Sequence, residues 1–275
     1  MLSELRNLRS NLTACLSEVH DWCTKRRLKL NPDKTKLIWF SSKTNRKKLS
    51  SMDTTLTFGG DIIESCSSVW NLGVLLDEEL TLQKHISYLS ASCFFHLRRL
   101  RQLRHILSQN DMQRFVSALV IARLDYCNAV LAGLPSSTLR PLTRVMHAAV
   151  RLISNLKYYD SVHDAMKKLH WLPFPHRVTY KLCLIMYKAK HQLCPSYITD
   201  LLQPLTSLEN RARLRSSSSS DYYVPRVRTE FGRRAFSVAG PVAWNKLPEQ
   251  IRASANIAMF KSSLKTHLFN IAYQQ

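Results

Sequence analysis

The sequence is short of glycine, of acidic residues and of long hydrophobic runs. Six glycines in 275 residues are few for a β-sandwich or a nucleotide-binding α/β enzyme, which favours a mainly helical fold. Nineteen Asp and Glu accompany 40 Lys and Arg, and a net charge of +21 makes nucleic acid the expected partner. The longest apolar run, 115–122, is far below the roughly 20 residues that cross a bilayer, so no membrane partner is expected.

The sequence also lacks any C-x-x-C pair, although it contains seven cysteines. A disulfide framework and a zinc ribbon are therefore both disfavoured, and the spacing of Cys183, His191 and Cys194 matches no zinc motif. The N-terminus lacks the continuous apolar core of a signal peptide. We expect an intracellular protein, in the nucleus or the cytoplasm, with no metal or other cofactor in this chain.

Hydrophobic periodicity predicts a mostly α protein with a small β element. Leucines at three- and four-residue spacing predict a helix over 2–28, and a period near 3.6 returns from Leu82 to about Leu202. Prolines predict breaks in that helical stretch at 134–135, 171–175 and 194–195, and a last helix is expected at 256–272. Short strands are predicted at 35–41, 54–58, 61–64 and 69–76, with a turn at Gly59-Gly60 and a basic loop at 43–51.

Several segments carry a family resemblance. LKLNPDKTKLIWF (28–40), which follows a helix ending in Asp21-Trp22, and NLGVLLD (71–77) resemble motif D and motif E of the palm in reverse transcriptases of LINE-type (non-LTR) retrotransposons. RLDYCNAVLAGLP (123–135), LHWLPFPHRVTYKL (169–182) and AFSVAGPVAWNKLPEQIR (235–252) are similar to the thumb and C-terminal segments of the same elements. The resemblance covers nearly the whole chain.

The resemblance implies a domain order and a set of motif residues. It implies a palm remnant with α+β structure, thumb-like helices, a helical region, a basic, serine-rich loop and a C-terminal segment, at 1–80, 81–135, 136–203, 204–230 and 231–275. The motif D-like residues are Asn31, Lys34 and Thr35. The resemblance implies that Lys34 aligns with the lysine of the family that is proposed to assist the pyrophosphate leaving group. The residues that resemble the primer grip are Leu72, Gly73 and Val74.

One catalytic element of the family has no counterpart in this sequence. In the family, two adjacent aspartates on a hairpin and a third upstream hold two magnesium ions, and this sequence contains no Asp-Asp pair. We therefore expect the chain to begin downstream of the fingers and the catalytic palm, to be inactive alone, and to need magnesium only as part of the full-length parent enzyme. The acidic group Asp77, Glu78 and Glu79 is expected to begin the next helix rather than to bind metal.

A basic stripe is the main candidate for nucleic-acid binding. In FFHLRRLRQLRH (94–105), leucines recur every three residues on one helix face, and Arg98, Arg101 and His105 recur on another. The resemblance places this stripe at the start of the thumb, along the primer–template duplex, where it would meet phosphates. A solvated basic face is the equally weighted alternative. Aromatic residues also adjoin basic ones: Trp22 is expected in the core, and Tyr222 and Tyr223 either stack on bases or lie in a flexible loop.

Three functional hypotheses follow. In the first, the chain is a fragment of a retrotransposon RNA-directed DNA polymerase that keeps affinity for RNA, DNA or a hybrid duplex without catalysis. In the second, it is an element-derived helical protein-interaction module or a non-functional remnant. In the third, an upstream polymerase portion supplied separately restores activity. In each case the first 80 residues are expected to be marginally stable, because their strands have open edges.

Overall fold

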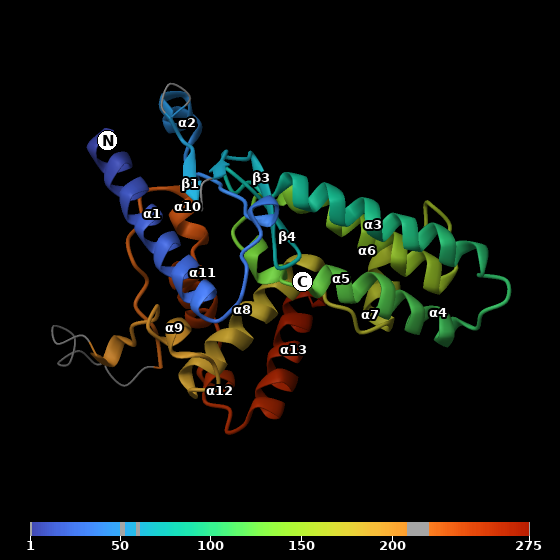
Figure 1. The fold of residues 1–275 in the computed structure, drawn as a ribbon. Coiled ribbons are helices and arrows are strands. Elements are labelled where there is room, and N and C mark those ends of the chain that lie inside the picture. Colours follow the sequence, from blue (N-terminus) through green and yellow to red (C-terminus); the bar gives the residue numbers. More distant parts are fainter. Residues whose placement is uncertain (1, 50–52, 59–60, 208–219, 275) are drawn as a thin grey trace. The chain divides into compact units, whose positions relative to one another are not determined.

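The computed structural model describes residues 2–49, 53–58, 61–207 and 220–274 and is mostly helical (Figure 1). The chain divides into two compact units, unit 1 (Met1–His85) and unit 2 (Ile86–Gln275). Unit 1 contains two small antiparallel sheets, whereas unit 2 is built from helices. The predicted mostly α chain with a small β element is confirmed. None of the helices in the described parts is long and apolar enough to span a membrane.

Unit 1 begins with the predicted amphipathic helix and continues with short elements. Leu16 of the first helix packs with Leu30 and Trp39 against a small core formed by Leu37, Leu56 and Ile63. The elements of unit 1 are α1 (Leu2–Lys25), the 3₁₀ helix η1 (Pro32–Lys34), α2 (Lys43–Leu49), β1 (Leu56–Phe58), β2 (Asp61–Ile63), β3 (Ser68–Asn71) and β4 (Val74–Asp77).

The strand predicted at 35–41 and the basic loop predicted at 43–51 were wrong. Residues 35–41 contribute one parallel bridge, between Leu37 and Ser65, because the chain beyond Cys66 turns away into β3 and leaves no partner for a longer ladder. In residues 35–41, the alternation of apolar and polar side chains reflects which side chains are buried and not the pairing of a strand with a neighbour. Residues 43–49 of the predicted loop form α2, which Ser42 caps by accepting a hydrogen bond from the amide of Asn45 at 3.4 Å.

The predicted strand at 69–76 is a hairpin. β3 pairs with β4 from Ser68 opposite Asp77 to Asn71 opposite Val74, and Leu72 and Gly73 form the two-residue turn. Both turn residues have positive φ, 45° and 81°, as a type I′ turn requires. A leucine at the first turn position carries none of the usual Asn-Gly or Asp-Gly signal, so the pattern looked like one continuous strand. β1 and β2 form the other predicted hairpin, and its turn at 59–60 lies outside the described residues.

The acidic group does not begin the next helix, which starts only at Gln83. Asp77 is buried, and its carboxylate accepts hydrogen bonds from the amides of Thr81 at 2.9 Å and Leu82 at 2.7 Å. The loop before the helix therefore folds around this carboxylate. Glu78 and Glu79 pair with the two terminal nitrogens of Arg46 at 2.8 and 3.1 Å, which ties α2 to the end of the hairpin.

Unit 2 confirms the predicted helical stretch and its breaks at 134–135 and 194–195. The break predicted at 171–175 is shorter, because α8 already begins at Phe174 with Pro175 in its first turn. Further breaks follow Gln102, Asp125 and Ser154 without a glycine or proline at the helix end. Asn155, for example, ends a helix in the left-handed conformation. The elements are α3 (Gln83–Gln102), which begins in unit 1, α4 (Gln109–Val116), the π-helix η2 (Ser117–Ile121), α5 (Ala122–Asp125), η3 (Asn128–Leu131), α6 (Ser136–Ser154), α7 (Val162–Lys168), α8 (Phe174–Lys190), α9 (Ser196–Thr199), η4 (Leu205–Ser207), α10 (Glu230–Arg234), α11 (Phe236–Asn245), α12 (Glu249–Arg252) and α13 (Ile257–Tyr273).

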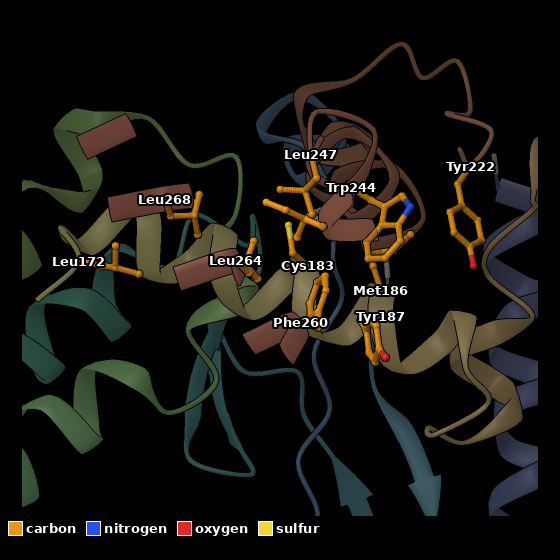
Figure 2. Close-up of a cluster of buried hydrophobic side chains, with 11 residues drawn as sticks. Leu172, Cys183, Met186, Tyr187, Tyr222, Trp244, Leu247, Phe260, Leu264 and Leu268 are labelled. Atoms are coloured by element: carbon orange, nitrogen blue, oxygen red, sulfur yellow. The ribbon is translucent and has the colours of Figure 1, made fainter. Parts of the chain in front are cut away.

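Helix α8 is the central element of unit 2 and contacts α6, η3, α11 and α13. Its buried face joins a core that Figure 2 shows in close-up, in which the rings of Tyr187 and Phe260 stack with centroids 4.3 Å apart. Trp244 is fully buried beside them, and its indole donates to the carbonyl of Ser220 at 2.9 Å. The C-terminal segment is thus folded onto α8 rather than extended.

Gly240 allows α11 to approach α8 closely. A Cβ atom at this position would lie 2.8 Å from the sulfur of Met186 and 3.1 Å from the ring of Phe236. Glycine is therefore needed for packing here, although a glycine inside a helix is unfavourable by itself. This explains one residue of the AFSVAGPVAW segment in physical terms.

The predicted basic, serine-rich loop is described only at its two ends, because 208–219 lie outside the described residues. Pro204 and Tyr222 form an antiparallel bridge, and the amide of Tyr223 donates to the carbonyl of Gln203 at 2.8 Å. Asp221 pairs with the buried guanidinium of Arg252. The two ends of the segment are therefore fixed to each other and to α12.

Candidate nucleic-acid interface

The motif D-like residues form a local turn in unit 1. The side-chain oxygen of Asn31 accepts from the amide of Asp33 at 2.9 Å, and the Thr35 hydroxyl donates to the Asn31 carbonyl at 3.0 Å. Together they cap the short helix η1, which is a sufficient structural reason for both residue types. Lys34 is exposed at the end of this turn. The structure thus brings Asn31, Lys34 and Thr35 together.

The primer-grip-like residues form the tip of the β3–β4 hairpin. Leu72 is 84% exposed in its left-handed conformation, whereas Val74 is buried. Behind the tip, the amide of Leu75 donates to Nδ1 of His85 at 3.3 Å, and the His85 ring lies edge-on to Trp70 with centroids 6.4 Å apart. A hairpin supported in this way presents its turn to solvent.

The basic stripe lies on α3 and faces away from the packed side of the helix. Leu97 and Leu100 are buried, while Arg98, Arg99 and Arg101 are exposed. The guanidinium of Arg99 lies over the ring of Phe95 at 5.6 Å. The spacing argument therefore separated the two faces of this helix correctly.

His105 does not belong to the same helical face. Helix α3 ends at Gln102, and the chain continues through tight turns in which the amides of Leu103 and Arg104 donate to carbonyls three residues back. His105 is exposed beyond this end, and Leu103 is 44% exposed rather than packed. The expected i+7 partner thus follows the helix instead of extending its stripe, because no buried side chain supports another helical turn.

Charge around α3 is of one sign. The sequence contains no Asp or Glu from Leu80 to Asn110, so α3 carries no carboxylate of its own. Burial, followed by the positive charges of Arg123 and Arg99, lowers the pKa of His96. Arg98 and Arg101 have no ion-pair partner in the described part of the chain. Within the described residues, the helix therefore presents arginines that form no ion pair with a carboxylate.

Two aromatic residues occupy positions other than those expected. Trp22 is 52% exposed rather than in the core, and the guanidinium of Arg26 lies 4.6 Å above its ring. Tyr222 is buried in the core of unit 2, where Asn245 bonds its backbone amide at 3.0 Å, so it is not available to stack on bases. Tyr223 is partly exposed. The alternation of aromatic and basic residues in the sequence therefore did not predict that Tyr222 is buried and Trp22 is exposed.

A magnesium site of the polymerase kind does not fit the described residues. No group of three or more His, Cys, Asp or Glu side chains that could hold a metal ion occurs among them. Asp77 uses both carboxylate oxygens on Thr81 and Leu82, and Glu78 and Glu79 are held by Arg46. No chemical step through magnesium follows from this arrangement.

An ion pair that the sequence pattern did not predict joins two of the resembling segments. The guanidinium Nε of Arg177 donates to Oδ1 of Asp125 at 2.8 Å, and a terminal nitrogen donates to Oδ2. The side-chain amide nitrogen of Asn128 also donates a hydrogen bond to Oδ1 of Asp125 at 3.4 Å. The pair borders a cavity of about 370 Å³ in unit 2. Asp125 and Arg177 both lie in segments quoted for the family resemblance, but sequence spacing alone gave no reason to bring them together.

Comparison with known proteins finds similarity to a transposon polymerase. Over 150 residues the chain is 27% identical to the probable RNA-directed DNA polymerase from transposon BS of Drosophila melanogaster, and the match covers 52% of this chain and 16% of that protein. No family model and no solved structure matches the chain. The chain thus spans about a sixth of the length of the curated relative it matches. The similarity indicates a relationship to the reverse transcriptases of retrotransposons.

Proposed function

We propose that the chain is a fragment of a LINE-type retrotransposon RNA-directed DNA polymerase, comprising the end of the palm, the thumb and the C-terminal region. We further propose that it binds nucleic acid through the arginine face of α3. The observation that carries the binding proposal is the pair Arg98 and Arg101, exposed on a helix without carboxylates. The similarity to a transposon polymerase supports the relationship on which it depends.

The physical basis of binding is phosphate neutralisation. Leu97 and Leu100 are buried, so the opposite face of α3 presents the guanidinium groups of Arg98 and Arg101 from a helix rather than from a loop. Guanidinium groups bind phosphate with two parallel hydrogen bonds and release condensed counterions from the duplex. RNA, DNA or a hybrid duplex is the proposed partner, because each presents a continuous line of backbone phosphates to the arginine face. His105 is exposed after the helix end, and we propose that it makes a separate phosphate contact beyond the arginine face.

Catalysis is not part of the proposal for this chain alone. The sequence contains no Asp-Asp pair, and in its tightest acidic group Asp77 accepts backbone hydrogen bonds while Glu78 and Glu79 pair with Arg46. Polymerisation and its magnesium ions would require a separate upstream polymerase portion as a partner. Mixing this chain with such a portion and measuring primer extension tests that part, and no extension would reject it.

The binding test compares two variants of equal charge. The purified chain is titrated with a labelled RNA–DNA duplex at about 50 and 200 mM salt, where six to ten phosphate contacts predict a loss of roughly a thousandfold or more in affinity. Arg98→Ala/Arg101→Ala should weaken binding and reduce the logarithmic salt slope by about 2. Arg114→Ala/Arg233→Ala is the control, because these exposed arginines already pair with Asp111 and Glu230.

The outcomes separate the hypotheses. A reduced slope in the α3 variant and an unchanged slope in the control support the proposed interface. No binding at the lower salt would instead favour an element-derived interaction module or a non-functional remnant. Equal losses in both variants would show that binding follows net charge and not the face of α3. An intracellular location, nuclear or cytoplasmic, is proposed together with nucleic-acid binding.

A further inference from the structure

The cavity beside the Asp125–Arg177 pair is assembled from segments that are far apart in the sequence. Arg177, Tyr180 and Lys181 come from α8, and Lys265 comes from α13. The π-helix η2, the turn around Asn128 and the loop 170–172 complete the wall. π-Helical turns of this kind occur frequently at functional sites. The volume of about 370 Å³ lies within the range of small-molecule sites.

The charge of the cavity favours an anion. Arg177 is neutralised by Asp125, which leaves Lys181 and Lys265 as the additional cations. Neither ammonium group has an ion-pair partner among the described residues. Two unpaired ammonium groups at one cavity, next to a guanidinium, are suited to the oxygens of a phosphate.

The remaining wall favours a flat, partly apolar body attached to that phosphate. Ile121, Trp171 and Leu172 are buried and line the cavity, and the ring of Tyr180 lines it as well. Asn128 is 2% exposed, and its side-chain oxygen has no hydrogen-bond partner within the described chain. A buried acceptor without a partner is rare in a completed site. Because Asn128 lines the cavity, this oxygen can accept a hydrogen bond from a ligand.

We propose that this cavity is a nucleoside-phosphate site, with the phosphate at Lys181 and Lys265 and the base against the side of Trp171 and Tyr180. Aromatic side chains stack on any base, so the site would take a nucleotide without strong base selectivity. The ligand is either a free mononucleotide or the phosphorylated terminal nucleotide of a strand. The second source rests on the proposed nucleic-acid binding, whereas the first does not.

Calorimetric titration of the full chain with adenosine 5′-monophosphate, adenosine and inorganic phosphate tests the site. The monophosphate should bind more tightly than adenosine or phosphate alone, because only it fills both parts of the cavity. Lys181→Ala/Lys265→Ala should weaken it by about tenfold or more. Lys188→Ala/Lys261→Ala is the matched control, since these lysines lie on the same two helices and are not among the lining residues. Circular dichroism confirms that both variants are folded.

Oligonucleotides with a 5′-phosphate or a 5′-hydroxyl distinguish the two sources. A strand end is the ligand if the phosphorylated strand competes with the mononucleotide and the hydroxyl strand does not, and a free nucleotide is the ligand if neither competes. Absence of mononucleotide binding at millimolar concentration, or equal losses in the two lysine variants, would overturn the site. Duplex binding by the Lys181→Ala/Lys265→Ala variant should stay dependent on Arg98 and Arg101, so failure of this site and failure of the α3 interface remain distinguishable.

Discussion

Arg177 donates hydrogen bonds from two nitrogens of its guanidinium to the carboxylate of Asp125, which lies 52 residues earlier in the sequence. The pair connects α5 with α8, and the side chain of Arg177 is 18% exposed while that of Asp125 is 34% exposed. Such a planar, two-point contact fixes direction as well as distance. It therefore positions the two segments that border the cavity.

Removal of either partner should destabilise unit 2. Asp125→Ala and Arg177→Ala each leave a charged group without its hydrogen bonds, and each should cost about 2 kcal/mol in the free energy of unfolding. The double variant should cost clearly less than the sum, because the second change removes a group that is already unpaired. Urea unfolding measures all three. Asp164→Ala, which alters a largely exposed carboxylate, should change stability by less than about 0.5 kcal/mol. Additive losses at Asp125 and Arg177 would mean that the contact is not formed.

The β3–β4 hairpin should weaken in mild acid. Burial lowers the pKa of His85, whose Nδ1 accepts the amide of Leu75. The unfolded chain then takes up a proton near pH 6.5 while the folded chain does not, so the free energy of unfolding falls as the pH drops below about 6.5. Denaturation of the protein at pH 7 and pH 5, followed by tryptophan fluorescence, measures this loss. His85→Gln should show a smaller difference between the two pH values, and an unchanged difference would contradict a role for His85.

The packing of α13 should weaken in strong alkali. Burial raises the pKa of Tyr273 to about 12, and its hydroxyl donates to the carbonyl of Trp171 at 2.6 Å. Unfolding releases this proton once the pH exceeds the ordinary value of about 10, so stability falls as the pH rises from about 10 to about 12. Tyr273→Phe should lose about 1 kcal/mol at pH 8 and depend less on pH within that window. Parallel pH profiles of wild type and variant would argue against the buried hydroxyl.

Gly240→Ala should be destabilising even though alanine favours helix. The added methyl would lie 2.8 Å from the sulfur of Met186, and overpacking of this kind costs about 1–3 kcal/mol, against a gain of about 1 kcal/mol in helix propensity. Thermal unfolding gives the net effect. In a Met186→Ala background the cost of Gly240→Ala should shrink, because the crowded atom is gone. A stabilised single variant would show that α11 does not need this close approach.

The sequence alone determined the class of the fold and most helices of unit 2. Leucine spacing predicted α1, and the prolines at 135, 173 and 195 marked true helix starts, because each mechanism acts within a few residues. The same leucine spacing predicted which face of α3 is buried and which face carries the exposed arginines. The resemblance of the motif segments indicated the relationship to a transposon polymerase, and the net charge predicted a nucleic-acid partner.

Tertiary structure decided what depends on partners distant in the sequence. Leu72 adopts a positive φ because the strands on both sides pair, and Gly73 was the only local residue that favoured a turn there. Asp77 caps a loop, Tyr222 is buried under the C-terminal segment, and Asp125 meets Arg177, each through contacts that only chain folding creates. Local periodicity shows which side of an element is apolar, but the identity of the group that meets each side is settled by packing. The cavity beside Arg177 is therefore a property of the fold and not of any one motif.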